Sequence, residues 1–422
     1  MTASSNGTSF AQWIGALPGG WQVARPKLVF DERRAPSLSQ DIHLTPSQTY
    51  GVLPQEKYME ITGTRVVLNL EGADNMKHVE PDDFVIHLRS FQGGIEHSAL
   101  PGKVSVAYTV LTPRSLAEPR FFRWVLKSQG YIQSLQATVN QLRDGQSIKY
   151  KDFDKVPLPL PPREEQRAIA DFLDEQTSGI DTLIGKQSQL IDTLRERRAA
   201  SIEEILSRSG GEPTRLKRHA HIQTGVTLSG DGAPGDPEWP YLRVANVQMG
   251  FVDTTVVKTL RVPRDLAHQS LLQAGDVLMT EGGDIDKLGR GSLWSGDIAP
   301  CLHQNHVFAV RPRSDLDSAF LVYLLDSASS RLYFRLTARK TTNLASTNKW
   351  TLGNLPLRLP PLQNQQATVA RADREVASID TLIAKAEEFI GLARERRAAL
   401  ITAAVTGQID VRTAWRAATV GA

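Results

Sequence analysis

Three blocks of sequence recur in this 422-residue chain at one fixed separation, and this repeat constrains the fold more than any other feature. Ile-Asp-Thr-Leu-Ile at 180–184 returns at 379–383, and Arg-Glu-Arg-Arg-Ala-Ala at 195–200 returns at 394–399. A Leu-x-Leu-Pro-Pro segment ending at Pro162 returns in the same register, ending at Pro361. Matches in one unbroken register indicate a duplication. We therefore expect two copies of one architecture, each with its own core, as the chain length also requires.

The repeated segments predict two long helices. Each follows a Pro-Pro pair, which fits a helix start, and carries apolar residues three, four or seven positions apart. The first helix is expected from Gln166 to Ser207, about 60 Å at 1.5 Å per residue, and the second ends at Gly407. Their matched stripes favour an antiparallel coiled coil within the chain, and the alternative is that each helix packs on its own globular block. The residues expected on this helix-pairing and subunit-docking surface are Ile180, Leu183, Leu190, Leu194, Ile379, Leu382, Phe389 and Leu400.

Glycines interrupt both predicted helices. Gly179, Gly185 and Gly391 each cost about 1 kcal/mol relative to alanine in a helix interior. Such a cost suggests that another element approaches the helix closely at these positions.

The remaining sequence predicts two globular blocks of mixed α and β structure. Residues 60–112 and 240–312 contain β-branched alternations broken by Gly and Pro turns, and helical stretches follow near 117–136 and 316–337. The fold class is therefore α+β, with two globular domains separated by two long helices in a pseudo-twofold repeat. The expected bounds are 1–157 for the first globular domain, 158–210 for the first spacer helix, 211–356 for the second domain, 357–412 for the second spacer helix and 413–422 for the tail.

Composition excludes several classes of protein. No run approaches 18 uncharged apolar residues, and the first ten residues lack the basic start and apolar stretch of a signal peptide. The single cysteine, Cys301, excludes a disulfide framework and a cysteine metal cluster. We expect a soluble, cytoplasmic protein that holds no metal.

The common catalytic motifs of DNA-modifying enzymes are absent. No Gly-x-x-x-x-Gly-Lys-Ser/Thr occurs, no lysine has an acid two residues before it, and Pro-Pro occurs only at the two helix entries. The only close histidine pairs are His219 with His221 and His303 with His306, and they are better explained as polar contacts or loop caps than as metal ligands. We predict no catalytic residues, and the alternative is a stand-alone DNA-modifying enzyme with a cryptic site.

Basic, acid-free stretches lie at the same place in both copies. Residues 119–143 and 327–372 contain no Asp or Glu, and each includes or leads to a loop rich in amides and hydroxyls, at 141–147 and 340–346. Arg and Lys bind phosphates or guanine edges, and Asn and Gln pair with adenine edges. The pattern indicates double-stranded DNA as a partner, and the alternative is a solvated charged helix face.

These features together resemble a known family. They are the Leu-x-Leu-Pro-Pro entries with a glutamine four residues later (Gln166 and Gln365), the paired helical blocks, the terminal segment 400–410, and the segments 241–247, 275–290 and 303–308. Over essentially its full length the sequence resembles the specificity (S) subunit of type I restriction–modification systems. The first globular block fits the family pattern more loosely than the second.

The resemblance implies that the chain recognises a DNA sequence and sets the separation of its two halves. Each globular block would be a target recognition domain that reads one half of a bipartite, asymmetric DNA site. The helices would set the half-site separation and dock two methyltransferase (M) subunits, through which two restriction (R) subunits join in antiphage defence. S-adenosylmethionine, ATP and Mg²⁺ would be used by those partners, with no cofactor in this chain and no membrane contact. A non-catalytic coiled-coil scaffold or a decoy S protein would look similar.

Candidate DNA contacts were chosen from the polar and basic loops of both blocks. In the first block they are Arg65, Arg89, Ser90, Gln92, Gln141, Arg143 and Lys149. In the second block they are Arg243, Asn246, Lys287, Arg290, Gln304, Asn305, Lys340, Thr341 and Asn343.

Overall fold

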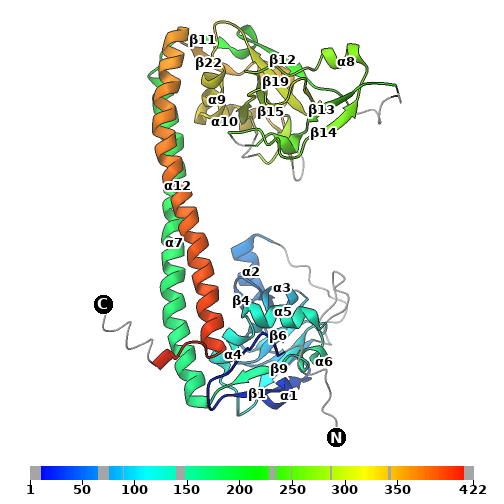
Figure 1. Cartoon of the computed structure of the whole chain (residues 1–422), viewed down its shortest axis with the longest axis vertical. Helices are drawn as coiled ribbons and strands as arrows, with labels where there is room; N and C mark the ends of the chain where they lie inside the picture. The colour runs from blue at the N-terminus through cyan, green and yellow to red at the C-terminus, as the bar shows by residue number, and fades with distance from the viewer. Residues whose placement is uncertain are drawn as a thin grey trace. The chain divides into compact units, whose positions relative to one another are not determined.

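The computed structural model divides into two compact units. Unit 1 comprises residues 1–186 and 389–422, and unit 2 comprises residues 187–388. The structure describes residues 11–64, 76–88, 90–138, 148–227, 233, 235–248, 250–285, 288–340 and 344–412. Each unit holds one globular block and one part of each long helix, α7 and α12 (Figure 1). The predicted class, two mixed α and β blocks with two long helices, is confirmed.

Unit 1 is built from short strands and helices that lead into the long helix α7. Its elements are β1 (Gln22–Ala24), α1 (Pro26–Val29), β2 (Phe30–Arg33), β3 (Leu44–Ser47), β4 (Gly51–Pro54), α2 (Gln55–Thr62), β5 (Lys77–Val79), β6 (Phe84–Ile86), α3 (Ser90–Gly93), β7 (Glu96–His97), β8 (Gly102–Val104), β9 (Thr109–Pro113), α4 (Pro119–Val125), α5 (Gln129–Ala137), α6 (Tyr150–Phe153), β10 (Leu158–Leu160) and the first part of α7 (Arg163–Ser207). The predicted helical stretch near 117–136 is thus two helices, α4 and α5.

Unit 2 follows a similar order of short strands and helices. Its elements are β11 (Glu212–Arg215), η2 (Leu216–Arg218), β12 (Ala220–Thr224), β13 (Glu238–Leu242), η3 (Val244–Asn246), β14 (Lys258–Arg261), α8 (Arg264–His268), β15 (Val277–Thr280), β16 (Gly282–Gly283), β17 (Gly291–Leu293), β18 (Leu302–His303), β19 (Val307–Pro312), α9 (Ser318–Asp326), α10 (Ala328–Thr337), β20 (Arg339–Lys340), β21 (Ala345–Ser346), α11 (Lys349–Gly353), β22 (Pro356–Leu359) and α12 (Leu362–Val405), which ends in unit 1.

The central sheets of the two units have the same topology. Unit 1 has the strand order β2-β9-β6-β7, and unit 2 has β12-β19-β15-β17. The registers also agree, because Phe30 pairs with Pro113 as Ala220 pairs with Pro312. Phe30 and Ala220 are therefore equivalent positions. The residues that follow them, Asp31 in unit 1 and His221 in unit 2, are equivalent as well. This register allows the two copies to be compared residue by residue.

Aromatic residues fill the core of each unit, and the long helices contribute to both cores. In unit 1 the fully buried Phe30 contacts Phe84 and Phe122 edge to face, and Leu173 of α7 and Ile401 of α12 join the same cluster. In unit 2 a corresponding cluster includes Phe308, Phe320 and Phe334, with Leu206 and Val369 of the long helices packed against it. Each globular block is therefore packed directly on its own stretch of the helices.

The two long helices run antiparallel in both units. In unit 1, Arg397 of α12 pairs with Asp181 of α7 at 2.9 Å. In unit 2, Arg198 pairs with Asp380 at 3.0 Å, and these two residues lie 199 positions from Asp181 and Arg397 in the other copy. Both proposed arrangements therefore occur together, since the helices pair with each other and also pack on the globular blocks. Within the described ranges, no helix is long and apolar enough to cross a membrane.

Four residues predicted on the helix-pairing surface face outward. Leu183, Leu190, Leu382 and Phe389 are 40–49% exposed, so placing them in the intramolecular seam was wrong. Each of them directly precedes an isoleucine, of which Ile191 and Ile390 are buried and Ile184 and Ile383 are half-buried. A shift of one residue turns a helix by about 100°, so these isoleucines pack and the residues before them point away. Leu194 and Ile379 are buried as predicted, whereas Ile180 and Leu400 are half-buried.

The helix glycines have open surroundings, contrary to the expected close approach. A Cβ atom added at Gly179, Gly185 or Gly391 would meet no atom within 4 Å outside its own helix turn. We therefore expect each Gly→Ala substitution to stabilise the chain by about 0.5–1 kcal/mol, because alanine restricts the unfolded backbone and favours helix. Thermal unfolding of Gly179→Ala and Gly185→Ala checks this, and a lower midpoint in both would contradict it.

One buried glutamine attaches each globular block to its helix. In unit 1, the Gln166 side chain accepts from the Glu118 N–H (2.8 Å) and donates to the carbonyls of Leu116 (3.1 Å) and Pro161 (2.9 Å). In unit 2, Gln365 accepts from the Asp317 N–H (2.8 Å) and donates to the carbonyls of Asp315 and Pro360 (2.8 Å each). Every partner lies 199 residues from its counterpart. Both blocks are thus fixed to the helices by the same three hydrogen bonds.

Candidate nucleic-acid interface

A tight turn after β18 presents two of the predicted DNA contacts in unit 2. The backbone of Gln304 donates to the Leu242 carbonyl (2.8 Å), and that of Asn305 donates to the Val226 carbonyl (3.0 Å). Both side chains are half-buried, and among the described residues neither amide has a hydrogen-bond partner. A fixed backbone with two available amides is the arrangement that direct reading of a base edge requires.

Hydrogen bonds join this turn to a second loop that carries Lys340. His306 at the end of the turn bonds Glu281 through its ring Nδ1 (2.6 Å), and the Glu281 carbonyl accepts from the Thr347 N–H (2.8 Å). A small sheet of order β16-β21-β20 then leads to Lys340, which is exposed. The structure therefore brings Gln304, Asn305 and Lys340 to one connected edge of unit 2.

Asn246 belongs to the interior and is corrected as a DNA contact. It is 4% exposed, and its side chain accepts from the Arg243 N–H (2.9 Å) and donates to the carbonyls of Asp253 (2.8 Å) and Val256 (3.0 Å). An amide with all of these bonds satisfied locks a loop and does not reach a ligand. Arg243 is half-buried and adjoins Leu242, whose carbonyl holds the Gln304 turn, so it remains a candidate beside that turn.

Arg290 lies in a different environment from the Gln304 turn. It lines a pocket whose other walls include Arg198, Asp326 and Asp380, so acidic groups share its surroundings. The remaining predicted contacts of unit 2 lie outside the described residues: Lys287, Thr341 and Asn343.

Ser90 in unit 1 is also corrected, because it is fully buried. Its hydroxyl accepts from the His87 N–H at 2.9 Å and so closes the turn before α3. Lys149 is exposed and precedes α6, where it remains a candidate for phosphate binding. Arg65, Arg89, Gln141 and Arg143 lie outside the described residues.

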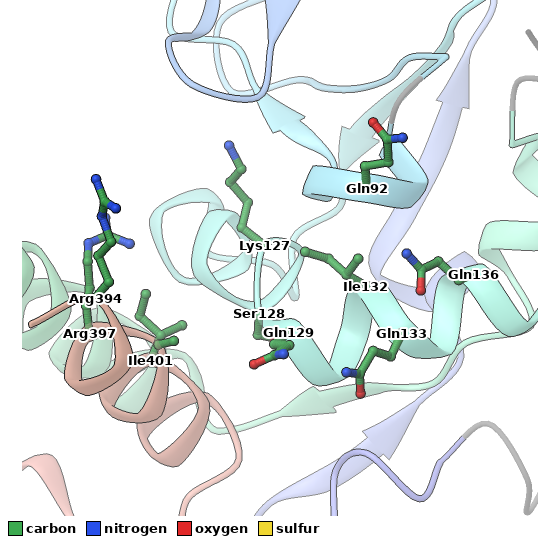
Figure 2. Close-up of a pocket in the computed structure, with 11 residues that line it drawn as sticks. Gln92, Lys127, Ser128, Gln129, Ile132, Gln133, Gln136, Arg394, Arg397 and Ile401 are labelled. Atoms are coloured by element: carbon green, nitrogen blue, oxygen red, sulfur yellow. The ribbon is translucent and has the colours of Figure 1, made fainter. Parts of the chain in front are cut away.

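Gln92 lines a polar pocket of about 500 Å³ in unit 1. Figure 2 shows Gln92 on α3, with Gln133 and Gln136 on the neighbouring helix α5 and Arg394 and Arg397 on α12. The described residues that line this pocket include no acid. Gln92 was predicted as a DNA contact and the other residues of this pocket were not, although glutamines at 129, 133 and 136 show helical spacing.

Lys127, at the edge of this pocket, has an unusual partner. Its ammonium group donates to the buried carboxyl of Glu96 at 2.7 Å. Burial raises the pKa of Glu96 to about 7, and the charge of Lys127 opposes this rise. Near neutral pH the carboxyl is therefore only partly ionised, so the positive charge of Lys127 is only partly compensated.

His303 has a structural role next to the Gln304–Asn305 turn. Its ring Nδ1 donates to the Val307 carbonyl at 2.7 Å and closes the turn that holds Gln304 and Asn305. This confirms the expectation that His303 makes a polar contact. Among the described residues, no group of three or more His, Cys, Asp or Glu side chains is placed to hold a metal ion.

Acidification is expected to weaken unit 2 through His303. Burial lowers the pKa of His303 to about 4, whereas an unfolded histidine has a pKa near 6.5. The unfolded state therefore binds more protons between these values, and stability is lost as the pH falls through this range. A change from pH 7 to pH 5 should cost on the order of 1–2 kcal/mol. Hydrogen exchange of residues 302–308 measures this, and His303→Gln should flatten the dependence, while His221→Gln at an exposed position should not. An unchanged profile in the wild type would contradict the assignment.

Comparison with known proteins gives one consistent answer. Residues 18–192 match the family model described as the type I restriction modification DNA specificity domain. The chain is 24% identical to the EcoKI specificity subunit of Escherichia coli K12 and 24% identical to the StySPI specificity subunit of Salmonella potsdam. Each comparison covers 96% of this chain and 92% of the relative.

Solved structures share the fold. A chain from a structural study of complex assembly and conformational transition of the type I R-M system aligns with a TM-score of 0.71 and 18% identity, over 93% of this chain and 100% of that one. The HsdS subunit of Thermoanaerobacter tengcongensis aligns with a TM-score of 0.50 and 19% identity, over 93% and 98%.

Over nearly its full length the chain is similar to the specificity subunits of type I restriction–modification systems, the family that its sequence resembles.

Proposed function

We propose that each unit reads one half of a bipartite DNA site. The observation that carries this proposal is the Gln304–Asn305 turn, where two amides without partners among the described residues are held on a fixed backbone. Exposed Lys340 is connected to this turn through His306, Glu281 and the β16-β21-β20 sheet. Such amides recognise adenine edges, and the lysine binds phosphate. In unit 1 the Gln92 pocket, with its glutamines and arginines, is the corresponding candidate. The duplicated sheets support one reader in each unit.

The outward apolar residues of the long helices support docking of two identical methyltransferase subunits. Leu183 in unit 1 and Leu382 in unit 2 are both 49% exposed and lie 199 residues apart. Leu190 and Phe389 form a second such pair, 44% and 40% exposed. Exposed apolar residues at equivalent places give two identical partners two equivalent contact surfaces.

Charge at these residues is expected to reduce methyltransferase binding stepwise. Leu183→Glu should lower the bound subunits from two per chain to one, and the double variant with Leu382→Glu should bind none, because a buried unpaired carboxylate opposes docking. Native mass spectrometry counts the subunits. Thr182→Glu with Thr381→Glu introduces the same charges at exposed neighbouring positions and is the control. Retention of two subunits by the double leucine variant would refute this docking surface.

The chemistry is assigned to the partner subunits. Methyl transfer from S-adenosylmethionine would occur in the methyltransferase subunits, and ATP- and Mg²⁺-dependent cleavage in two restriction subunits, in the cytoplasm. This chain would contribute the DNA site and the separation of its halves. Helix α7 has 45 residues, which at 1.5 Å per residue is about 68 Å and exceeds one helical turn of DNA.

The test is co-expression with a type I methyltransferase, followed by mapping of modified adenines across the host genome. The proposal predicts one bipartite motif with a fixed gap. Exchange of residues 1–156 for those of a relative should change one half of the motif, and exchange of 212–355 should change the other. A stable complex that methylates nothing indicates a decoy protein. Methyl transfer by the purified chain alone would instead establish a stand-alone enzyme.

A further inference from the structure

A pocket in unit 2 combines exposed cations with an exposed tryptophan. It has a volume of about 500 Å³, and its walls include Lys217, His221, Arg313, Lys349 and Trp350. The described residues that line it include no acid. Trp350 is 74% exposed, although tryptophan is a residue type that proteins usually bury. A positively charged pocket beside an exposed indole is suited to bind an anionic ligand.

The walls of this pocket are held rigidly. Lys217 donates to the side chain of Asn354 at 2.8 Å, and Arg215 donates to the Asn354 carbonyl at 2.8 Å. Trp350 stands on α11, a short helix whose N-cap Asn348 accepts from the Thr351 N–H at 2.8 Å. Among the described residues Arg313 and Lys349 form no ion pair. Lys217 is thus held in place by Asn354, and Arg313 and Lys349 have no counter-ion among the described residues.

The corresponding place in unit 1 is compensated by acids. Arg114, which follows β9 as Arg313 follows β19, forms an ion pair with Asp31. Arg25, at the position of Arg215, pairs with Asp154 at 2.6 Å. Asp154 lies 199 residues before Gly353, the last residue of α11, so unit 2 has a glycine at the place of this acid.

The substitution of these two acids is the difference between the copies. The sheet register puts His221 where unit 1 has Asp31, and the 199-residue repeat puts Gly353 where unit 1 has Asp154. Unit 2 has therefore kept Arg215, Lys217 and Arg313 and lost both internal counter-ions. It has gained Lys349 and Trp350, where unit 1 has Tyr150 and Lys151.

We propose that this pocket, named here the Trp350 pocket, binds the phosphate backbone of duplex DNA outside the bases that unit 2 reads. This inference rests on the proposed function. Lys and Arg without counter-ions bind phosphates, and an indole packs on the sugar or donates its N–H. Val226 is hydrogen-bonded to the Gln304–Asn305 turn, and His221 lies five residues before it along β12 and its extension. At about 3.3 Å per residue the pocket is about 16 Å from the turn, which is the length of about five base pairs. The pocket would thus bind backbone next to the half-site.

A protein partner is less consistent with the difference between the two units. Two identical subunits dock on equivalent surfaces, but the equivalent surface in unit 1 is neutralised by Asp31 and Asp154. An asymmetric DNA site has no such requirement, because its two flanks differ. The observations therefore favour DNA.

The experiment measures binding of a 30-base-pair duplex by the full chain in complex with its methyltransferase, by fluorescence anisotropy between 50 and 300 mM salt. Arg313→Gln with Lys349→Gln should lower the slope of log K against log salt by about 1.8, since each phosphate contact contributes about 0.9. Affinity should fall at least 10-fold at low salt for a duplex with the motif and for a shuffled duplex alike. The methylated motif should stay the same, because no base contact has changed.

Two further variants and one control make the test specific. Trp350→Ala should weaken binding 3- to 10-fold with an unchanged salt slope. His221→Asp should restore the counter-ion of unit 1 and lower the slope by about 1. Arg114→Gln in unit 1 is the matched control and should leave the slope unchanged, because Arg114 is already paired with Asp31. Thermal unfolding of each variant shows that these exposed changes leave the fold intact.

The outcomes separate this inference from the proposed function. A wild-type salt slope in Arg313→Gln with Lys349→Gln, on a complex that still methylates its motif, overturns the Trp350 pocket alone. Loss of methyltransferase binding with an unchanged DNA slope also overturns it and assigns the surface to a protein partner. Failure of the wild-type complex to bind or methylate any DNA overturns both the pocket and the proposed function.

Discussion

Replacement of Gly225 by alanine is expected to abolish sequence reading by unit 2. An added Cβ atom would lie 2.5 Å from the Gln304 carbonyl oxygen and closer still to the His303 carbonyl oxygen. Both are backbone atoms, so the turn itself must move. That movement breaks the hydrogen bonds from Val226 N–H to the His303 carbonyl (2.8 Å) and from Asn305 N–H to the Val226 carbonyl (3.0 Å).

The expected effect is large because Gln304 and Asn305, the two side chains proposed to read bases, lose their position together. Each good base contact contributes about 1–3 kcal/mol of discrimination, so specific affinity should fall about 100-fold. Binding to shuffled DNA should change much less, because its phosphate contacts remain. The measurement is the ratio of affinities for motif and shuffled duplexes. Gly235→Ala is the matched control, since its added Cβ meets no atom within 4 Å. A wild-type ratio in Gly225→Ala would show that the turn does not read DNA.

The repeat allowed the architecture to be predicted from the sequence, but the orientation of side chains around each helix was not predictable. Leu183 and Leu382 were assigned to the seam because leucine at helical spacing is usually buried. The isoleucine after each of them gives nearly the same periodicity, and only packing decides which of two adjacent apolar residues faces inward. The same ambiguity explains why the outward stripe became visible only in the structure.

Polar residues were harder to assign than apolar ones. Asn246 and Gln304 both belong to segments that look like DNA-reading sequence, yet one is sealed by three hydrogen bonds and the other has an amide without a described partner. The difference comes from Asp253 and Val256, whose carbonyls return to Asn246 from a later loop. Such long-range partners leave no local pattern in the sequence.

The Trp350 pocket shows the complementary case. Its cations can be read from the sequence, but the sequence does not show that they lack counter-ions. Only the shared register of β12 and β2 identifies His221 as the residue that replaces the counter-ion Asp31. Duplication is informative here because one copy serves as the reference for the other.

The second large effect is expected at the buried glutamines Gln166 and Gln365, which are 1% and 0% exposed. Substitution of either by alanine leaves one N–H and two carbonyls of the backbone without partners in a site closed to water. Each such group costs about 1–3 kcal/mol, so the affected unit should lose on the order of 3–5 kcal/mol. Glutamate should not rescue this loss, because it cannot donate to the carbonyls of Leu116 and Pro161, or of Asp315 and Pro360.

A positioning role for these glutamines has a readout beyond stability. The three bonds fix each globular block on the helix that is proposed to set the half-site separation, so their loss should loosen that separation. In Gln166→Ala and in Gln365→Ala, adenine mapping should show the same half-site sequences joined by gaps one base pair longer or shorter as well as the original gap. Gln189→Ala, at an exposed position on α7, is the control for a helix glutamine without this role. If the unfolding temperature falls but the gap stays fixed, the glutamines stabilise the blocks without determining the half-site separation. In that case the position of each block on the helices would have to come from its apolar contacts, in unit 1 those of Leu173 and Ile401.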